Sequence, residues 1–246
     1  MSDIHVLENE QAAAQEAASH IIGALAKVLE AGDRARLAVS GGSTPKMMFA
    51  EMAARAADLD WKRVDIFWVD ERMVPPGHAD SNFSSVEAAL IHPLRLDPWQ
   101  VYRIEGERAP DDAAERYAAR VRGAFGIAKD ELPRFDVIHL GLGSDGHTAS
   151  LFPGEPRIDD RLGLTAALEM ESKKAWRVTL LPGALVQAAE IVFLATGKPK
   201  AAALRAARGK AYNHSLRPAQ LIEREGSHVV WFVDQAAAGK TVTSVA

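Results

Sequence analysis

Short apolar runs alternate along the chain with longer helix-like stretches. The apolar runs are Leu37–Val39, Val64–Val69, Val137–Leu142, Val178–Leu180, Ile191–Ala195 and Val229–Val233. Most of them are nearly continuous rather than alternating, as in strands buried on both faces of a parallel sheet. The helix-like stretches are Pro45–Ala57, Ser84–Leu90, Asp111–Phe125, Pro182–Ala189 and Lys198–Arg208. This succession predicts a three-layer α/β/α sandwich with a mostly parallel, Rossmann-like sheet, formed as one domain by residues 1–246.

The segment before the first apolar run has its own helical pattern. Apolar residues recur at helical spacing through Glu10–Leu29, and Gly32 is a suitable stop, so we expect an amphipathic helix there. Two segments, His92–Gly106 and Arg157–Ala175, look like longer connections. We expect the second of them to be able to carry a small hairpin.

Composition narrows the classes of protein. The chain has 246 residues, 48% of them hydrophobic, no Cys and a formal net charge of -4. The lack of Cys excludes disulfides and thiolate metal sites, and a slightly acidic chain is a poor general binder of nucleic acid. The N-terminus shows no secretory signal, and no run approaches the roughly 18 apolar residues of a membrane span. We therefore expect a cytoplasmic protein that acts on a small molecule, without nucleic-acid or membrane partners.

Ligands of an open parallel sheet bind beyond the carboxyl ends of its strands, so the loops after the strands are informative. The first loop reads Ser-Gly-Gly-Ser-Thr-Pro over Ser40–Pro45. Its glycines allow a tight turn, and its free N–H groups at the start of a helix form an anion site, typically for phosphate. The candidate residues are Gly41, Gly42, Ser43 and Thr44. The alternative is an ordinary capped turn between strand and helix.

The second loop places three charges in a row, Asp70, Glu71 and Arg72, at the end of a buried strand. An Arg here can grip a phosphate or a carboxylate, and a carboxylate here can accept a proton or position the Arg. The alternative is a solvated cluster of ion pairs. Asn82, which follows a Pro/Gly loop, is a further candidate for ligand contact.

The third loop, Gly141–Thr148, formally contains the G-x-G-x-x-G pattern of dinucleotide sites. We reject that interpretation because Asp145 and His147 lie inside the turn, and no strand ends at an acidic residue about 20 residues further on. A carboxylate two residues from an imidazole is instead an acid–base pair. His139, within the preceding strand, is interpreted as structural.

The fourth loop carries Lys200, which can bind an anionic substrate as a point charge, although a surface helix lysine is the simpler interpretation. Arg177 is a weaker candidate of the same kind. The histidines are scattered and no H-E-x-x-H motif occurs, so we expect no metal site.

Taken together, these loops resemble the 6-phosphogluconolactonase family, within a wider group that includes glucosamine-6-phosphate deaminases. The matching segments are Ser40–Pro45, Val69–Arg72, Ser81–Asn82, Gly141–Pro153, Arg177–Leu180, Thr196–Lys200 and Arg217–Ala219. The resemblance implies hydrolysis of 6-phospho-D-glucono-1,5-lactone to 6-phosphogluconate, the second step of the oxidative pentose phosphate pathway. It implies an α/β sandwich, and neither a metal nor a nucleotide cofactor is expected.

On this resemblance His147 acts as general base on water and Asp145 orients its ring. The Gly42–Thr44 turn and Lys200 hold the phosphate, and Arg72 binds either the phosphate or the developing oxyanion. Asp70, Asn82 and Arg177 complete the candidate binding residues. We expect a monomer or a weak homo-oligomer.

Two alternatives belong to other classes. In the deaminases, Asp-Gly-His is followed by a pattern that resembles Ala-Phe-Asn-Glu-Pro, and its Glu partners the catalytic His. In this chain Phe152 occupies the place of that Glu, which favours a lactonase. Arg72 also favours a lactonase over a deaminase, because deaminases tend to carry an aromatic residue after Asp-Glu. A non-catalytic sugar-phosphate sensor usually adds a helix-turn-helix module, for which the N-terminal helix leaves little room.

Overall fold

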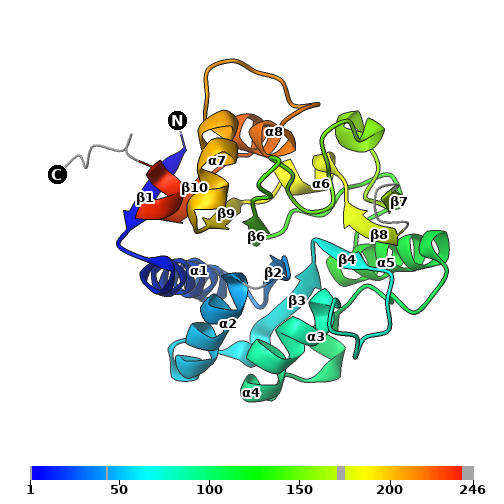
Figure 1. Ribbon diagram of the computed structural model, residues 1–246. Helices are drawn as coiled ribbons and strands as arrows, with labels where there is room; N and C mark the ends of the chain where they lie inside the picture. The colour runs from blue at the N-terminus through cyan, green and yellow to red at the C-terminus, as the bar shows by residue number, and fades with distance from the viewer. Residues whose placement is uncertain (1, 43, 171–174, 240–246) are drawn as a thin grey trace.

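A seven-stranded sheet forms the centre of the molecule in the computed structural model (Figure 1), which describes residues 2–42, 44–170 and 175–239. In spatial order its strands are β1 (Asp3–Leu7), β10 (Val229–Asp234), β9 (Glu190–Ala195), β6 (Val137–Gly141), β2 (Ala35–Val39), β3 (Val64–Trp68) and β5 (Val101–Tyr102). Each neighbouring pair is parallel. Their carboxyl ends therefore lie along one edge of the sheet.

Helices cover both faces of this sheet. The helices are α1 (Glu10–Ala31), α2 (Thr44–Ala54), α3 (Asn82–Val86), α4 (His92–Leu94), α5 (Pro110–Phe125), α6 (Pro182–Val186), α7 (Ala201–Ala207), α8 (Pro218–Glu225) and α9 (Gln235–Ala238). Figure 1 shows α1 and α2 on one side of the sheet and α7 and α8 on the other. The prediction of a three-layer sandwich with a mostly parallel sheet is confirmed.

Single turns of other helix types link these elements. The 3₁₀ turns are η1 (Ala56–Asp58), η2 (Trp61–Arg63), η4 (Pro98–Gln100), η5 (Pro156–Asp159) and η7 (Lys198–Lys200), and η3 (Glu87–Ile91) is a π turn. The predicted helix from Pro45 therefore ends at Ala54, three residues early, because the chain tightens into η1.

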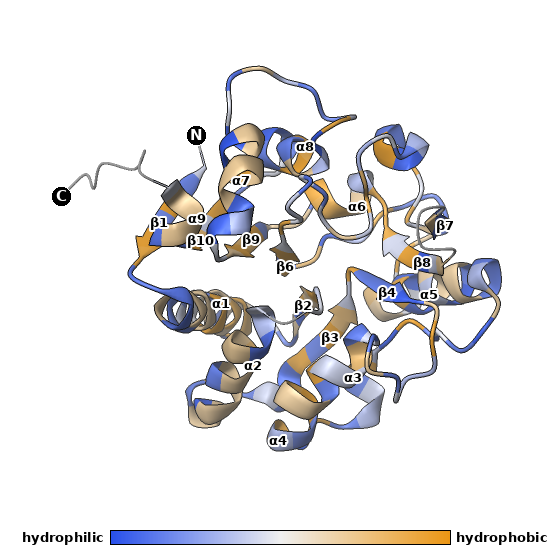
Figure 2. Cartoon of the chain, viewed as in Figure 1, coloured by the Kyte–Doolittle hydropathy of each residue, from blue (hydrophilic) through white to orange (hydrophobic). Residues whose placement is uncertain are grey.

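Apolar side chains of the strands and of the inward helix faces make up the core. Figure 2 shows hydrophobic residues along much of the central strands and hydrophilic residues in the outer loops. The apolar face of α1 is buried as its periodicity predicts, and Gly32 caps the helix directly after Ala31. At its start, the Asn9 side chain accepts a hydrogen bond from the N–H of Ala12, 2.9 Å away.

A second, antiparallel sheet corrects part of the predicted strand pattern. It contains β4 (Asp70–Arg72), β8 (Ala175–Leu180) and β7 (Thr165–Met170) in that order. The run Val178–Leu180 thus lies outside the parallel sheet. Only the second half of β8 is buried, and this half supplies the short apolar run. The run therefore looks like that of a buried parallel strand, and the sequence did not show that it belongs to the second sheet. Of the hairpin expected within Arg157–Ala175, only β7 lies in that segment; its antiparallel partner β8 begins at Ala175 and continues beyond it.

Two strands of the parallel sheet, β1 and β5, escaped the sequence prediction. β1 is an edge strand that pairs only with β10, and its residues are partly exposed rather than continuously apolar. β5 has two residues and lies in the segment that we interpreted as a long connection. Among the described residues, no helix is long and apolar enough to cross a membrane.

Candidate active site

A pocket opens at the carboxyl ends of β2, β3, β6 and β9, with a volume of about 240 Å³. The predicted residues that line it are Gly41, Gly42, Thr44, Asp70, Arg72, Asn82, His147, Arg177 and Lys200. Asp145 lies outside the lining and contacts His147. Ser43 lies outside the described residues. The loops that the sequence singled out therefore converge on one pocket.

The Gly41–Gly42 turn needs its glycines for two different reasons. A Cβ on Gly41 would lie 2.2 Å from Oδ1 of Asn82, so only glycine lets these two loops approach. Gly42 has a φ of +119°, which L side chains rarely adopt. Thr44 and Pro45, the first residues of α2, line the pocket, so the first turn of the helix, with its unpaired N–H groups, lies at the pocket. This geometry suits an anion such as phosphate.

The imidazole of His147 is held by the carboxylate of Asp145. Nδ1 of His147 lies 2.6 Å from Oδ1 of Asp145, and the backbone N–H of His147 donates to the same oxygen at 3.1 Å. A neutral ring that donates from Nδ1 keeps a lone pair on Nε2 for accepting a proton. Gly143 makes room for the pair, because a Cβ there would lie 2.1 Å from Nδ1.

Burial and charge set the protonation of this pair. Burial lowers the pKa of His147 below its ordinary value of 6.5, although the negative charge of Asp145 opposes the shift. Burial alone would raise the pKa of Asp145, but its contacts with His147 lower it below its ordinary value. At neutral pH the carboxylate is therefore charged and the imidazole is neutral, which is the form that can act as a base.

Glu71 is a structural residue that sequence analysis did not recognise. Its buried carboxylate accepts hydrogen bonds from the backbone N–H groups of Arg72, Asn82 and Phe83, each at 2.7 Å. Burial raises the pKa of Glu71 despite these bonds. The carboxylate thereby ties the start of α3 to β4. This arrangement corrects the alternative of a solvated ion-pair cluster, since Asp70 and Glu71 are both buried.

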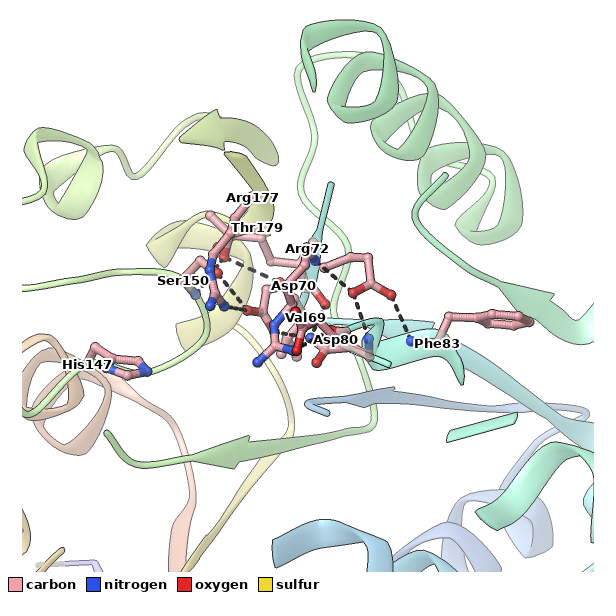
Figure 3. A network of polar contacts seen from close by, with 12 residues as sticks. Val69, Asp70, Arg72, Asp80, Phe83, His147, Ser150, Arg177 and Thr179 are labelled. Atoms are coloured by element: carbon pink, nitrogen blue, oxygen red, sulfur yellow. Dashed lines mark hydrogen bonds and ion pairs between the residues drawn. The ribbon is translucent and has the colours of Figure 1, made fainter. Parts of the chain in front are cut away.

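Asp70 and Arg177 form a second charged cluster in the pocket (Figure 3). Nη1 of Arg177 lies 3.6 Å from Oδ2 of Asp70, and the Oγ of Ser150 donates to the same oxygen at 2.6 Å. The side chain of Asn82 donates to Oδ1 of Asp70 at 3.1 Å. Burial, helped by the nearby charge of Arg72, lowers the pKa of Arg177. Arg72 and Arg177 are paired across β4 and β8 and both line the pocket, and two guanidinium groups at one pocket favour an anionic ligand.

Lys200 reaches the same pocket from the last residue of η7, after β9. Gly197, which precedes the turn, has a φ of +89° and donates its N–H to Asp234 at 2.9 Å. The loop is thus anchored to the end of β10. The pocket combines the imidazole of His147 with cations from β4, β8 and η7. Within the described parts of the chain, no group of three or more His, Cys, Asp or Glu residues could hold a metal ion.

Comparison with known proteins identifies the family. The family model described as glucosamine-6-phosphate isomerases/6-phosphogluconolactonase matches residues 8–231. The chain belongs to this family. The resemblance drawn from the loop motifs is therefore confirmed.

Individual members of the glucosamine-6-phosphate isomerase/6-phosphogluconolactonase family agree with this assignment. The chain is 40% identical to a 6-phosphogluconolactonase of Treponema pallidum (strain Nichols) over 165 residues, 67% of this chain and 68% of that protein. It is 37% identical to a 6-phosphogluconolactonase of Homo sapiens over 214 residues, 85% of this chain and 82% of that protein. The solved structure of 6-phosphogluconolactonase from Leishmania guyanensis matches with a TM-score of 0.87 and 26% identity, over 99% of this chain and all of that one.

Proposed function

We propose that the chain hydrolyses 6-phospho-D-glucono-1,5-lactone to 6-phospho-D-gluconate, the second step of the oxidative pentose phosphate pathway. The family supports a sugar-phosphate substrate. The observation that carries the choice of lactone hydrolysis is the Asp145–His147 pair at a pocket that Arg72, Arg177 and Lys200 also line. A phosphorylated lactone presents an anion at one end and an electrophilic carbonyl at the other.

In the proposed reaction, Nε2 of His147 accepts a proton from water as its oxygen attacks C1 of the lactone. A tetrahedral oxyanion forms and then collapses, which breaks the bond between C1 and the ring oxygen. The ring oxygen takes the proton from His147 and becomes the hydroxyl of the open-chain acid. Such general-base catalysis contributes about 10²- to 10⁴-fold. Asp145 holds the ring and stabilises its protonated form.

The phosphate is assigned to the Gly42–Thr44 turn and Lys200. Arg72 has one of two roles, binding the phosphate or stabilising the oxyanion, and kinetics of Arg72→Ala separate them. Loss of phosphate binding raises KM, whereas loss of oxyanion stabilisation lowers kcat. Asp70 lies beside Arg177 and is assigned to its positioning.

The test compares hydrolysis of the phosphorylated lactone with that of the unphosphorylated lactone, each above its spontaneous rate. We expect a higher kcat/KM for the phosphorylated substrate. Ammonia release from glucosamine 6-phosphate would favour the deaminase alternative. Tight binding of 6-phosphogluconate without lactone turnover would favour a sensor and contradict the proposal.

A further inference from the structure

The ring of Phe152 lies directly against the imidazole of His147. Their ring centroids are 4.2 Å apart, with an angle of 32° between the planes. The guanidinium carbon of Arg177 lies 5.6 Å from the centroid of the same Phe152 ring. His147 and Arg177 line the pocket, whereas Phe152 lies outside the lining. One aromatic side chain thus contacts both the proposed base and Arg177 from outside the substrate space.

The loop holds Phe152 in place through the end of β6. The Oγ of Thr148 donates to the carbonyl of Gly141 at 2.9 Å, and the N–H of Leu151 donates to the carbonyl of Thr148 at 3.0 Å. The carbonyl of Phe152 accepts from the N–H of Glu155 at 3.0 Å. Leu151 is fully buried beside it. Phe152 and His147 are therefore fixed to the same strand end.

Asp145 alone leaves the imidazole one freedom. A single hydrogen bond at Nδ1 restrains that edge of the ring, but the two side-chain torsions of His147 can still change together while the bond is kept. A flat apolar ring packed against one face of the imidazole removes this freedom, since turning would lose the contact between the rings. The contact also keeps water from that face of the ring.

The charged groups that face His147 come from three elements. Asp145 lies on its own loop, Asp70 comes from β4 and Arg177 from β8. Asp70 and Arg177 act on the imidazole with opposite sign. Arg72 and Lys200 are further cations of the same pocket. Burial is the largest influence on this imidazole and lowers its pKa, and the apolar contact with Phe152 adds to that burial and favours the neutral ring.

We propose that Phe152 is a positioning residue for His147: the phenyl ring of Phe152 fixes the plane of the imidazole. The proposal rests on the assignment of His147 as base. The proposal gives Phe152, five residues after His147, a function in the lactonase reaction itself. Phe152 acts through His147 and does not contact the substrate.

The test is a double-mutant cycle of Phe152→Leu with His147→Asn. Phe152→Leu keeps apolar volume but removes the ring, so we expect kcat to fall about 10- to 100-fold, as for a misplaced catalytic group. KM should change less than about threefold, since substrate contacts remain. In the His147→Asn background, Phe152→Leu should cause no further loss. Enzyme concentration is raised there until the residual rate exceeds spontaneous hydrolysis.

A second readout reports on the imidazole without any turnover. The titration midpoint of the His147 ring, followed by NMR, should rise in Phe152→Leu towards its ordinary value, because water then reaches the ring. The acid limb of kcat should move to higher pH with it. Phe152→Tyr keeps the ring and should restore both values. Phe152→Met, which fills a similar volume, replaces Phe152→Leu if the latter does not fold.

Phe83→Leu is the matched control. Phe83 is also half-buried beside the site, but its ring packs on Trp68, 5.6 Å between centroids. Its removal should leave the His147 midpoint unchanged. Equal losses from Phe152→Leu in both backgrounds, with an unchanged His147 midpoint, would mean a merely structural role and overturn the proposal. If His147→Asn kept its activity, the assignment of His147 as base would be wrong. The NMR midpoint would still show whether Phe152 controls the environment of the ring.

Discussion

Two histidines of one strand and its following loop lie in opposite environments. His139, inside β6, is fully buried and meets the ring of Phe49 edge-on at 5.9 Å between centroids. Burial lowers the pKa of His139 to about 3. His147, beyond the end of β6, pairs with Asp145 and lines the pocket. An imidazole thus becomes a candidate base through a neighbouring carboxylate and access to a ligand, while the same side chain in the strand is a neutral core residue.

The largest expected difference between the two histidines is catalytic. His147→Asn removes the proposed base, so we expect kcat to fall about 10²- to 10⁴-fold with little change in KM. His139→Leu replaces an imidazole that does not line the pocket, and kcat should change less than about 10-fold. Steady-state kinetics of both variants check this. A larger loss of kcat in His139→Leu than in His147→Asn would contradict the assignment of His147 as the base and of His139 as a core residue.

The geometry of the pocket histidine, His147, can be disturbed without changing its side chain. Gly143→Ala would place a Cβ 2.1 Å from Nδ1 of His147 and 2.4 Å from Oδ1 of Asp145. The pair must then move apart or shift, and a displacement of about 1 Å costs about 10²-fold in rate. Gly77→Ala is the control, because its added Cβ meets nothing within 4 Å. Wild-type kcat in Gly143→Ala would show that the pair is not needed in this geometry.

The buried histidine should reveal itself through stability rather than rate. The pKa of His139 is about 3 in the folded chain, whereas an unfolded His titrates near 6.5. The unfolded chain therefore binds the proton more readily, and stability is lost as pH falls from about 6.5 towards about 3. The slope is up to about 1.4 kcal/mol per pH unit.

Urea unfolding of wild type and His139→Leu between pH 7 and pH 4 measures this contribution. The difference in unfolding free energy between the two proteins should move in favour of His139→Leu as pH falls. A difference that stays constant with pH would mean that His139 is protonated, or accessible, in the folded chain.

The smallest expected effect concerns the other end of the pocket. Lys200→Ala removes one cation from the proposed phosphate site, so KM should rise about 10-fold, as for one hydrogen bond to a charged group. The value of kcat should remain close to wild type, because His147 and Asp145 are untouched. Kinetics with the unphosphorylated lactone supply the control, since that substrate should not distinguish the variant from wild type. A fall in kcat with unchanged KM would move Lys200 to the reacting end.

Local features were predictable from sequence. Asp145 and His147 are two residues apart, so one turn can bring their side chains together, and the neighbouring glycines predict that turn. The periodicity of Glu10–Leu29 gave α1, with Gly32 at its end. The strand–helix succession was sufficient to predict which loops meet at one edge of a parallel sheet.

Long-range features were not predictable in the same way. The contact of Asp70 with Ser150 and Arg177 depends on β4 pairing with β8, and nothing in the two short segments specifies that pairing. Glu71 was grouped with its charged neighbours, because its partners are backbone N–H groups of a helix start ten or more residues away. Phe152 was recognised as a difference from deaminases, but its contact with His147 requires the folded loop.

The central claim is that neutral His147, held by Asp145, is the base of a lactone hydrolase. Its most direct test is the pH profile of kcat/KM for the phosphorylated lactone, measured together with the NMR titration of the His147 ring in the free protein. Because burial lowers the pKa of His147, activity should persist below pH 6.5, and the acid limb should coincide with the ring's midpoint. An acid limb that departs from the ring's midpoint, or remains in place in His147→Asn, would contradict the account.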